Sequence, residues 1–413
     1  MKRKVASPDL GVGMYVVELD RPWIEAPFES PFEIEGFTVR TDEELEKVRS
    51  FCRYVYIDPD LGTPAKRHLI DGDQHADASK VVTSMPSESW SAEVYRDQVT
   101  LQEEVPAAQA VLDDTESLYE KIISDLGADS QPDAPAVHKV VTGLVGSVVR
   151  NPEALSWLVS LKQKDEGMYV HAISTAVLAL TVGRFLGLPK DRLQVLGTSA
   201  LLQDIGKTAV PAEILNKESS LTEDERQSIQ EHVDASVDML EKSRNFDIEV
   251  IHTVRLHHER FDGSGYPQKL SKVQIPLLAS LCGIVDCYQA GISARPYRDA
   301  KTSFQVLMEL YAERDIAFPA GIIEQFIQCV GIFPIGGFVK LNTMEIGIIV
   351  RRNQIQQLKP QVMILIDANG NRIEDPQTVD LNAQYLGSGQ MSRLVSTVVD
   401  PAHYNLDPSE FFL

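Results

Sequence analysis

Apolar and polar positions divide the chain into stretches of different periodicity. In residues 1–60, short apolar runs alternate with polar positions at residues 14–19, 37–39 and 54–57, which predicts three strands. A capping pattern at residues 41–44 predicts a short helix between the last two strands. This part of the chain is therefore predicted to form a small α+β domain.

The next stretch has no strand periodicity. Residues 61–106 begin with a run rich in Ser, Asp and Gly that includes Pro64 and Pro86, a composition typical of a linker. Apolar positions then recur at helical spacing over residues 107–126, and an Asp- and Pro-rich break follows up to residue 135. We expect a connecting helix here, which would either dock on the following domain or pair in a dimer.

Helical spacing of apolar residues dominates residues 136–332, a sensible length for one all-α domain. The chain then changes character, because residues 333–413 contain short apolar runs and a turn signal typical of a β unit. The runs lie at residues 338–341, 346–350 and 362–366, and the turn signal is Asn369-Gly370. The predicted fold class is mainly α, with a helical domain between a small N-terminal α+β domain and a small C-terminal β unit.

The net charge of the chain limits the kinds of molecule that it can bind. The chain has 39 Lys and Arg residues against 60 Asp and Glu residues, and its formal net charge is −21. Such an acidic chain is a poor ligand for duplex nucleic acid or an anionic membrane. A phosphate-bearing substrate would need a local cluster of basic side chains.

The cysteines and the N-terminus indicate a compartment. No cysteines are spaced as Cys-x-x-Cys, and their surroundings predict buried thiols, as in a reducing cytosol. The four are Cys52, Cys282, Cys287 and Cys329. The basic start at residues 1–4 has no apolar segment behind it, and no run reaches the roughly 18 apolar residues of a membrane span. We therefore expect a soluble cytoplasmic protein without a membrane span.

The strongest chemical signal lies in residues 257–267, which read His-His-Glu-Arg-Phe-Asp-Gly-Ser-Gly-Tyr-Pro. A helix is predicted to end near the two histidines, because Gly263 and Gly265 allow positive φ and Pro267 cannot continue the helix. Two imidazoles at the rim of such a loop are candidate metal ligands. The same pair would equally suit a solvated helix terminus, where histidines interact favourably with the helix dipole.

Further candidate ligands lie elsewhere in the helical domain. His171 lies on one predicted helix, and the alternative to a ligand role is a hydrogen-bonded histidine in the core. His232 lies on another predicted helix, at residues 223–240, where the alternative is a position on an exposed helix face. Asp204 and Asp286 lie in apolar surroundings, where a buried carboxylate has to be paired or bound to a metal. Two such carboxylates and four histidines on separate helices favour one metal site in the core of a helical bundle.

Residues 257–267 resemble the signature of the HD-GYP family, and the signature is complete through Gly265-Tyr266-Pro267. This family is a bacterial subgroup of the HD metal-dependent phosphohydrolases and hydrolyses cyclic di-GMP. The resemblance implies cleavage of cyclic di-GMP, with either pGpG or GMP as the final product. The stretch at residues 10–23 resembles an uncharacterised domain that often precedes HD-GYP domains, and this second resemblance implies no chemistry.

The resemblance also implies a metal centre. The HD aspartate of the family matches Asp204, which would bind two ions. His232, His257 and His258 would complete one ion site with it, and His171 and Asp286 would contribute to the other. Two such cations bind the oxygens of a phosphodiester and acidify a water between them. Imidazole with carboxylate suits Fe or Mn, with Zn as an alternative, whereas Ca and Mg are not expected.

Basic residues near these ligands supply the missing positive charge. Lys207 follows Asp204 by three residues, on the same predicted helix face, and matches the lysine of the family's HDxGK element. It is the candidate catalytic partner of Asp204 and a phosphate contact, with an ordinary helix ion pair as the alternative. The other candidate substrate contacts are Gly265, Tyr266 and Pro267, and Arg295 and Arg298, which match a later phosphate-contacting pair of the family.

Gln203 departs from the family pattern, because the family has a metal-binding histidine at this position. A neutral amide oxygen is a weaker donor than imidazole, so the ion beside His171 and Asp286 would be held less tightly, by Gln203 Oε1 or with a water in its place. Gly167, four residues before His171, offers no side chain, which argues against a third ion. A mononuclear or weakly dinuclear centre is expected.

Two functions fit these residues. The first is a phosphodiesterase acting on cyclic di-GMP with an activity that Gln203 reduces. The second is an impaired domain that binds the nucleotide or a partner protein as a regulator, and the otherwise intact site favours the enzyme. An HD hydrolase acting on another nucleotide or phosphate ester is a third interpretation, which the Gly-Tyr-Pro loop disfavours. Expected protein partners are a diguanylate cyclase with a GGDEF domain, another signalling protein, or a second copy of the chain.

Overall fold

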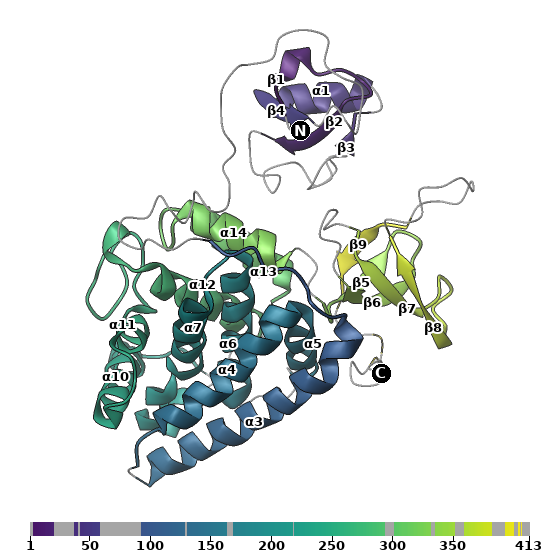
Figure 1. Cartoon of the computed structure of the whole chain (residues 1–413). Coiled ribbons are helices and arrows are strands. Elements are labelled where there is room, and N and C mark those ends of the chain that lie inside the picture. Colours follow the sequence, from purple (N-terminus) through teal and green to yellow (C-terminus); the bar gives the residue numbers. More distant parts are fainter. Residues whose placement is uncertain are drawn as a thin grey trace. The chain divides into compact units, whose positions relative to one another are not determined.

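The structure is a computed structural model that describes most of the chain. The described residues are 3–19, 37–39, 42–57, 92–128, 130–162, 168–217, 219–293, 301–331, 335–351, 359–381, 393–399, 404 and 406. Backbone contacts separate a helical unit, within Ala76–Gly331, from the sheets near the two ends of the chain (Figure 1). The predicted fold class, mainly α with small sheets at either end, is confirmed.

A small antiparallel sheet of order β1-β4-β2-β3 lies near the N-terminus. Its strands are β1 (Arg3–Ala6), β2 (Tyr15–Leu19), β3 (Phe37–Thr38) and β4 (Tyr54–Ile57), accompanied by the 3-10 turn η1 (Ser7–Asp9) and helix α1 (Asp42–Phe51). Buried side chains of the sheet and the helix form one apolar core, which includes Val5, Val16, Val48 and Val55. The three predicted strands and the helix are present, and β1 is an addition that the alternation of residues did not reveal.

Helix α3 (Leu101–Gly127) begins six residues before the predicted start at Ala107, so that predicted boundary is wrong. The Thr100 hydroxyl accepts a hydrogen bond from the Glu103 N–H, and the Glu103 carboxylate accepts one from the Thr100 N–H. This capping box starts the helix ahead of Pro106, which lies inside the helix. The last residues of the predicted linker are therefore helical.

The connecting helix α3 is part of the helical unit. Of the two alternatives from the sequence, it therefore follows the first, docking on the helical domain. It packs along α4 (Ala134–Arg150) and α5 (Pro152–Lys162), as Figure 1 shows. Arg150 donates hydrogen bonds to both carboxylate oxygens of Glu104, at 2.8 and 2.7 Å, and this ties α4 to α3. The predicted break ends early, because Pro135 is accommodated in the first turn of α4.

The remaining helices bring distant parts of the sequence together. Helix α6 packs on α7 and α12, and α11 contacts α7, α10 and α12 (Figure 1). The elements are α6 (Met168–Phe185), α7 (Lys190–Leu202), η3 (Ile205–Ala209), α8 (Ala212–Leu215), α9 (Glu223–Gln230), α10 (His232–Ser243), α11 (Ile248–Leu256), η4 (Lys272–Gln274), α12 (Leu277–Ile292), α13 (Ser303–Ala312) and α14 (Ala320–Val330).

The single helix predicted over residues 223–240 is wrong, since α9 and α10 meet at Glu231. This residue keeps a helical φ of −62°, but its ψ of −14° interrupts the hydrogen-bond ladder. The helical spacing of apolar residues continues across this turn, so the sequence does not reveal that one helix ends and another begins. Its consequence is that His232 becomes the first residue of a new helix.

The C-terminal sheet is antiparallel and has the order β8-β7-β6-β5-β9. Its strands are β5 (Phe338–Leu341), β6 (Ile346–Arg351), β7 (Gln361–Ile366), β8 (Arg372–Asp380) and β9 (Val395–Val398). The three predicted strands are present, and the turn at Asn369-Gly370 joins β7 to β8, with φ +88° at the glycine. Strand β9 was not predicted, because it depends on pairing with the distant β5.

The prediction of buried thiols holds for Cys52, Cys282 and Cys329. It is wrong for Cys287, which is half-buried. The Cys287 sulfur accepts a hydrogen bond from Arg260 Nη2 at 3.3 Å, on the side of α12 that faces the loop after α11. Among the described helices, none combines the length and the apolar character that crossing a bilayer requires.

Candidate metal centre

Asp204 lies in the turn between α7 and η3 and is only 3% exposed. Lys207 is close to it, with Nζ 2.8 Å from Asp204 Oδ2. The two residues share a 3-10 turn and not the predicted α-helix face, because α7 ends at Leu202. Burial would raise the pKa of the Asp204 carboxyl, but the charges of Lys207 and of nearby histidines outweigh burial and hold this pKa well below its usual range.

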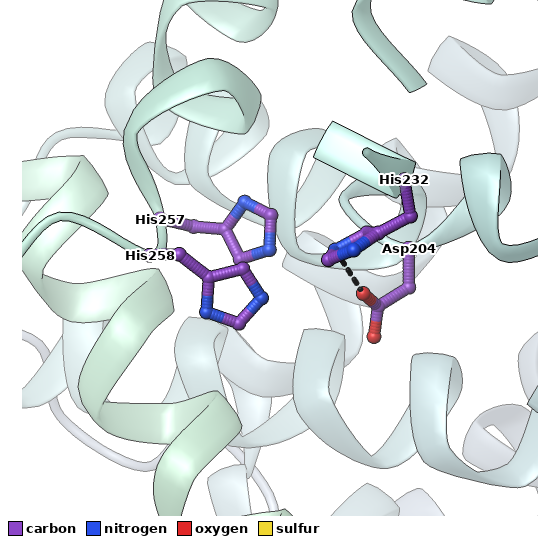
Figure 2. A group of neighbouring side chains, drawn as sticks. All are labelled: Asp204, His232, His257 and His258. Carbon is purple, nitrogen blue, oxygen red and sulfur yellow. Dashed lines mark ion pairs between the residues drawn. The ribbon is translucent and has the colours of Figure 1, made fainter. Parts of the chain in front are cut away.

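Three histidines face Asp204 from the ends of two helices (Figure 2). His232 begins α10, and His257 and His258 follow the last residue of α11. In both His232 and His257, Nδ1 lies 2.6 Å from the backbone carbonyl oxygen three residues earlier in the chain. Since a carbonyl oxygen only accepts, Nδ1 carries a hydrogen in both rings, and Nε2 is the ring nitrogen left to bind a metal.

The candidate ligand atoms of Asp204 and the three histidines lie around a common point. The Nε2 atoms of His232 and His257 and both carboxylate oxygens of Asp204 are buried, and within the described part of the chain none has a hydrogen-bond partner. His232 Nε2 lies 3.1 Å from Asp204 Oδ1 and Lys207 Nζ lies 2.8 Å from Asp204 Oδ2, and neither close contact has hydrogen-bond geometry. Ligand atoms of these residues and of His258 all lie within 4.8 Å of one another. Buried polar atoms are normally satisfied, so the group fits a cation that takes nitrogen and oxygen ligands.

A second group of ligand atoms shares Asp204 with His171 on α6 and Asp286 on α12. His171 donates from Nε2 to Asp286 Oδ1 at 3.0 Å, and the same nitrogen lies 3.7 Å from Asp204 Oδ2. Burial would raise the pKa of Asp286, but the hydrogen bond from His171 together with favourable charges nearby outweighs burial and keeps the pKa below its usual range. Asp204 thus belongs to both groups, an arrangement that suits a carboxylate between two ions.

Gln203 is the C-cap of α7 and is 1% exposed. Neither its Oε1 nor its Nε2 has a hydrogen-bond partner among the residues that the structure describes. A buried amide without partners costs about 1–3 kcal/mol, so such a residue in an ordinary core would be unfavourable. The side chain is therefore free to bind something other than the protein itself.

Burial keeps the histidines after α11 neutral. It lowers the pKa of His257 to about 4. Burial, together with the neighbouring His257, lowers the pKa of His258 well below its usual range. Neutral imidazole is the form that binds metals, so these side chains are in the right protonation state at neutral pH.

The Gly-Tyr-Pro loop packs back against the histidines. The ring of Tyr266 stacks on His258, with ring centroids 4.6 Å apart and planes inclined by 26°. Glu259 is buried, and its carboxylate accepts from the N–H groups of Gln268 and Leu270 at 2.6 and 2.8 Å. Glu259 thus holds the end of the loop, and Tyr266 stands at the edge of the ligand group.

The two loop glycines serve different purposes. Helix α11 ends at Leu256, close to the histidines as predicted. Gly263 has the expected positive φ, of +85°. The prediction that Gly265 needs positive φ is wrong: it is required by a close approach, since a Cβ there would overlap the backbone nitrogen of Arg260 and lie 2.5 Å from the Cα of Glu259.

Three predicted residues, Arg295, Arg298 and Gly167, lie outside the described residues. Tyr119 on α3 was missed by sequence reasoning: it is fully buried, and its hydroxyl has no hydrogen-bond partner within the described ranges. Burial and, to a smaller extent, the charge of Asp204 raise the pKa of this phenol. The sequence showed it merely as one apolar position of the connecting helix.

Known families match three parts of the chain. An HD domain matches residues 154–318, which include both groups of candidate ligands. A domain of unknown function (DUF3391) matches residues 2–137, and a KOW domain associated with HD domain matches residues 338–385. The helical unit that carries the candidate ligands therefore contains an HD domain.

Individual relatives carry more specific names. Cyclic di-GMP phosphodiesterase PA4108 of Pseudomonas aeruginosa is 30% identical over 396 residues, 96% of this chain and 92% of the relative. Cyclic di-GMP phosphodiesterase response regulator RpfG of Xanthomonas campestris pv. campestris is 35% identical over 43% of this chain and 48% of its own length. A Vibrio cholerae protein, 3'3'-cGAMP-specific phosphodiesterase 2, is 29% identical over 41% of this chain and 32% of its own. Because the first similarity spans nearly all of both proteins, this chain belongs to the family of HD-domain phosphodiesterases that includes the Pseudomonas protein.

Proposed function

We propose that this protein is a metal-dependent phosphodiesterase that hydrolyses cyclic di-GMP, with pGpG or GMP as the final product. The observation that carries the proposal is the group of Asp204, His232, His257 and His258, whose buried nitrogen and oxygen atoms fit a transition-metal ion. The names of the Pseudomonas and Xanthomonas relatives support cyclic di-GMP as the substrate.

In this proposal the centre is either mononuclear or holds a second ion more weakly than the first. The group carrying the three histidines would bind the tighter ion, and Asp204 would also bind the second, with His171, Gln203 and Asp286. Imidazole and carboxylate donors suit Fe and Mn, with Zn as an alternative. When bound, the ions would neutralise the charge of the phosphodiester and lower the pKa of a water molecule.

The protein's own residues would bind and orient the substrate. Lys207 has a side chain that is 22% exposed, and its ammonium group lies beside Asp204, where it can reach a phosphate oxygen. Arg295 and Arg298 are proposed to add two further positive charges, which a chain of net charge −21 needs at a phosphate site. Residues 265–267 are proposed as contacts at the rim, where Tyr266 stacks on His258.

Gln203 takes the position of a metal-binding histidine in this proposal and weakens the second ion site. One observation favours a second candidate function, a regulator that binds cyclic di-GMP without efficient hydrolysis. That observation is the buried Gln203 amide, a neutral and weak donor that lacks protein partners among the described residues. The Asp204 and histidine group favours the enzyme over this alternative.

The cellular setting belongs to the proposal as well. We expect a cytoplasmic signalling protein whose protein partner is a diguanylate cyclase with a GGDEF domain, another signalling protein or a second copy of the chain. The response regulator among its relatives supports a signalling role. The proposed HD-GYP domain is residues 136–332, preceded by an N-terminal domain at 1–60, a linker at 61–106 and a connecting segment at 107–135, and followed by a β-rich extension at 333–413.

Hydrolysis by protein loaded anaerobically with Fe²⁺ or Mn²⁺ tests the proposal. We expect pGpG from cyclic di-GMP, formed faster than any product from 3'3'-cGAMP, cyclic AMP or dNTPs. Asp204→Asn should abolish turnover, because it removes the charge of the shared ligand while keeping its size. Asp234→Asn is the matched control, since Asp234 is exposed on α10 two residues after His232. Faster hydrolysis of another nucleotide would change the substrate, and tight cyclic di-GMP binding without product would favour the regulator.

A further inference from the structure

A buried hydroxyl joins the backbone on both sides of Asp204. Ser236 lies on α10 and is 0% exposed. Its hydroxyl donates to the Gln203 carbonyl oxygen at 2.9 Å and accepts from the Gly206 N–H at 2.8 Å. One side chain therefore bridges the turn whose middle residue is the shared candidate ligand.

The helix that carries this hydroxyl also carries a candidate ligand. Ser236 follows His232 by four residues, so the two side chains lie on one face of α10, one turn apart. At one end of this face, His232 Nε2 lies 3.1 Å from Asp204 Oδ1. At the other end, the hydroxyl holds the backbone of the Asp204 turn. Helix α10 thus fixes Asp204 and His232 relative to each other.

The packing at Gly206 leaves little room for another arrangement. A Cβ at this position would overlap the His232 carbonyl oxygen and lie 2.5 Å from the Ser236 backbone nitrogen. The turn therefore rests directly on the backbone of α10, at a place where Gly206 is buried. Water does not readily replace a hydroxyl at such a contact, and a buried N–H without a partner is costly.

We infer that Ser236 is a positioning residue of the metal centre, whose hydroxyl holds Asp204 at the place where one ion can bind it together with His232. The inference rests on the proposed metal centre, and it adds a residue that is not a ligand. Partners that orient metal ligands typically contribute about 10–100-fold to metal affinity. Ser236 acts through the backbone of the turn, whereas most such partners bond the ligand's own side chain.

Mn²⁺ binding to metal-free protein, measured by calorimetry without nucleotide, tests this role. Ser236→Ala should weaken Mn²⁺ affinity by about 10–100-fold in protein that is still folded. The matched control is Ser199→Ala, because Ser199 is also 0% exposed and its hydroxyl donates to the Val195 carbonyl of α7 at 2.9 Å and, more weakly, to the Val250 carbonyl of α11 at 3.5 Å. This control loses a buried hydroxyl bond away from the turn and should keep wild-type affinity.

A second measurement does not depend on the variant folding. In wild-type metal-free protein, amide hydrogen exchange at Gly206 should be slow, because its N–H is bonded to the Ser236 hydroxyl. Rapid exchange at Gly206 would overturn the inference, as would equal Mn²⁺ affinity in wild type and Ser236→Ala. Wild-type protein that binds no Mn²⁺ would overturn the proposed metal centre itself, which is a different result.

Discussion

Replacing Gln203 with methionine separates a metal ligand from a polar core residue, because the two roles predict effects of opposite sign. Methionine has nearly the length and volume of glutamine and a similar helix propensity. Gln203 is 1% exposed, and both of its amide atoms lack hydrogen-bond partners among the described residues. Without metal, the substitution removes an unsatisfied buried amide.

The magnitude follows from the burial of that amide. An unpaired buried polar group costs about 1–3 kcal/mol, so metal-free Gln203→Met should have a free energy of unfolding up to about 1–3 kcal/mol above that of wild type. With metal bound, wild type should instead be more stable than Gln203→Met. An ion held at 100 times its Kd stabilises the native state by about 2.7 kcal/mol, and the variant should lose this gain at the second site.

Urea unfolding with chelator and with Mn²⁺, together with a count of bound ions, measures both effects. Gln289→Met is the matched control: Gln289 is 6% exposed on α12, but its Nε2 donates to the Ser174 carbonyl oxygen at 3.3 Å. This control should lower the free energy of unfolding with or without metal. A metal-free Gln203→Met protein less stable than wild type, with unchanged ion content, would show that Gln203 is an ordinary core residue.

Three further predictions concern other parts of the site. Metal-free protein should lose about 3 kcal/mol of unfolding free energy from His257 alone between pH 6.5 and 4, since the unfolded chain protonates this imidazole near pH 6.5 and the native state does so at about pH 4. Stability is thus highest above pH 6.5, and His257→Asn should show a smaller loss in urea titrations. His257→Ala should remove more metal than His171→Ala when ions are counted by mass spectrometry. Arg295→Ala should weaken cyclic di-GMP binding by about 1.5–3 kcal/mol in calorimetry and leave the metal content unchanged.

Each of these predictions has a clear opposite. Equal acid sensitivity of wild type and His257→Asn would contradict the assigned cause of the pH effect. Greater metal loss in His171→Ala would reverse the order of the two ion sites. Unchanged nucleotide affinity in Arg295→Ala would show that Arg295 does not contact the substrate.

The candidate ligands could be found from the sequence because they match motifs of the family that residues 257–267 resemble, and because local context already limited the roles of the two carboxylates and of the histidine pair. Asp204 follows Leu201 and Leu202, and Asp286 lies in an almost wholly apolar helix, so both carboxylates had to be buried. The structure does bury both. The end of α11 beside the histidine pair could also be predicted from neighbouring residues, since the apolar spacing stops there and glycines follow.

Features that depend on contacts between distant segments could not be predicted. The hydroxyl of Ser236 matters because η3 packs on α10, and nothing near position 236 in the sequence indicates this. Tyr119 occupies an apolar position of α3 like its neighbours, and only the fold buries its hydroxyl. The hydrogen on Nδ1 of His257 likewise depends on a backbone carbonyl that the helix end presents. Strand β9 shows the same limit, because it exists through its pairing with β5.

The proposed metal centre is tested most directly by measuring bound ions and pGpG formation together, in wild type and Gln203→His purified anaerobically with Fe and Mn supplied. Wild-type protein should hold at least one ion per chain and form pGpG. Gln203→His should hold closer to two ions and turn over faster, because the new imidazole would join His171, Asp204 and Asp286 around the second ion. If both proteins bound their ions and cyclic di-GMP yet formed no pGpG, the proposed phosphodiesterase activity would be contradicted.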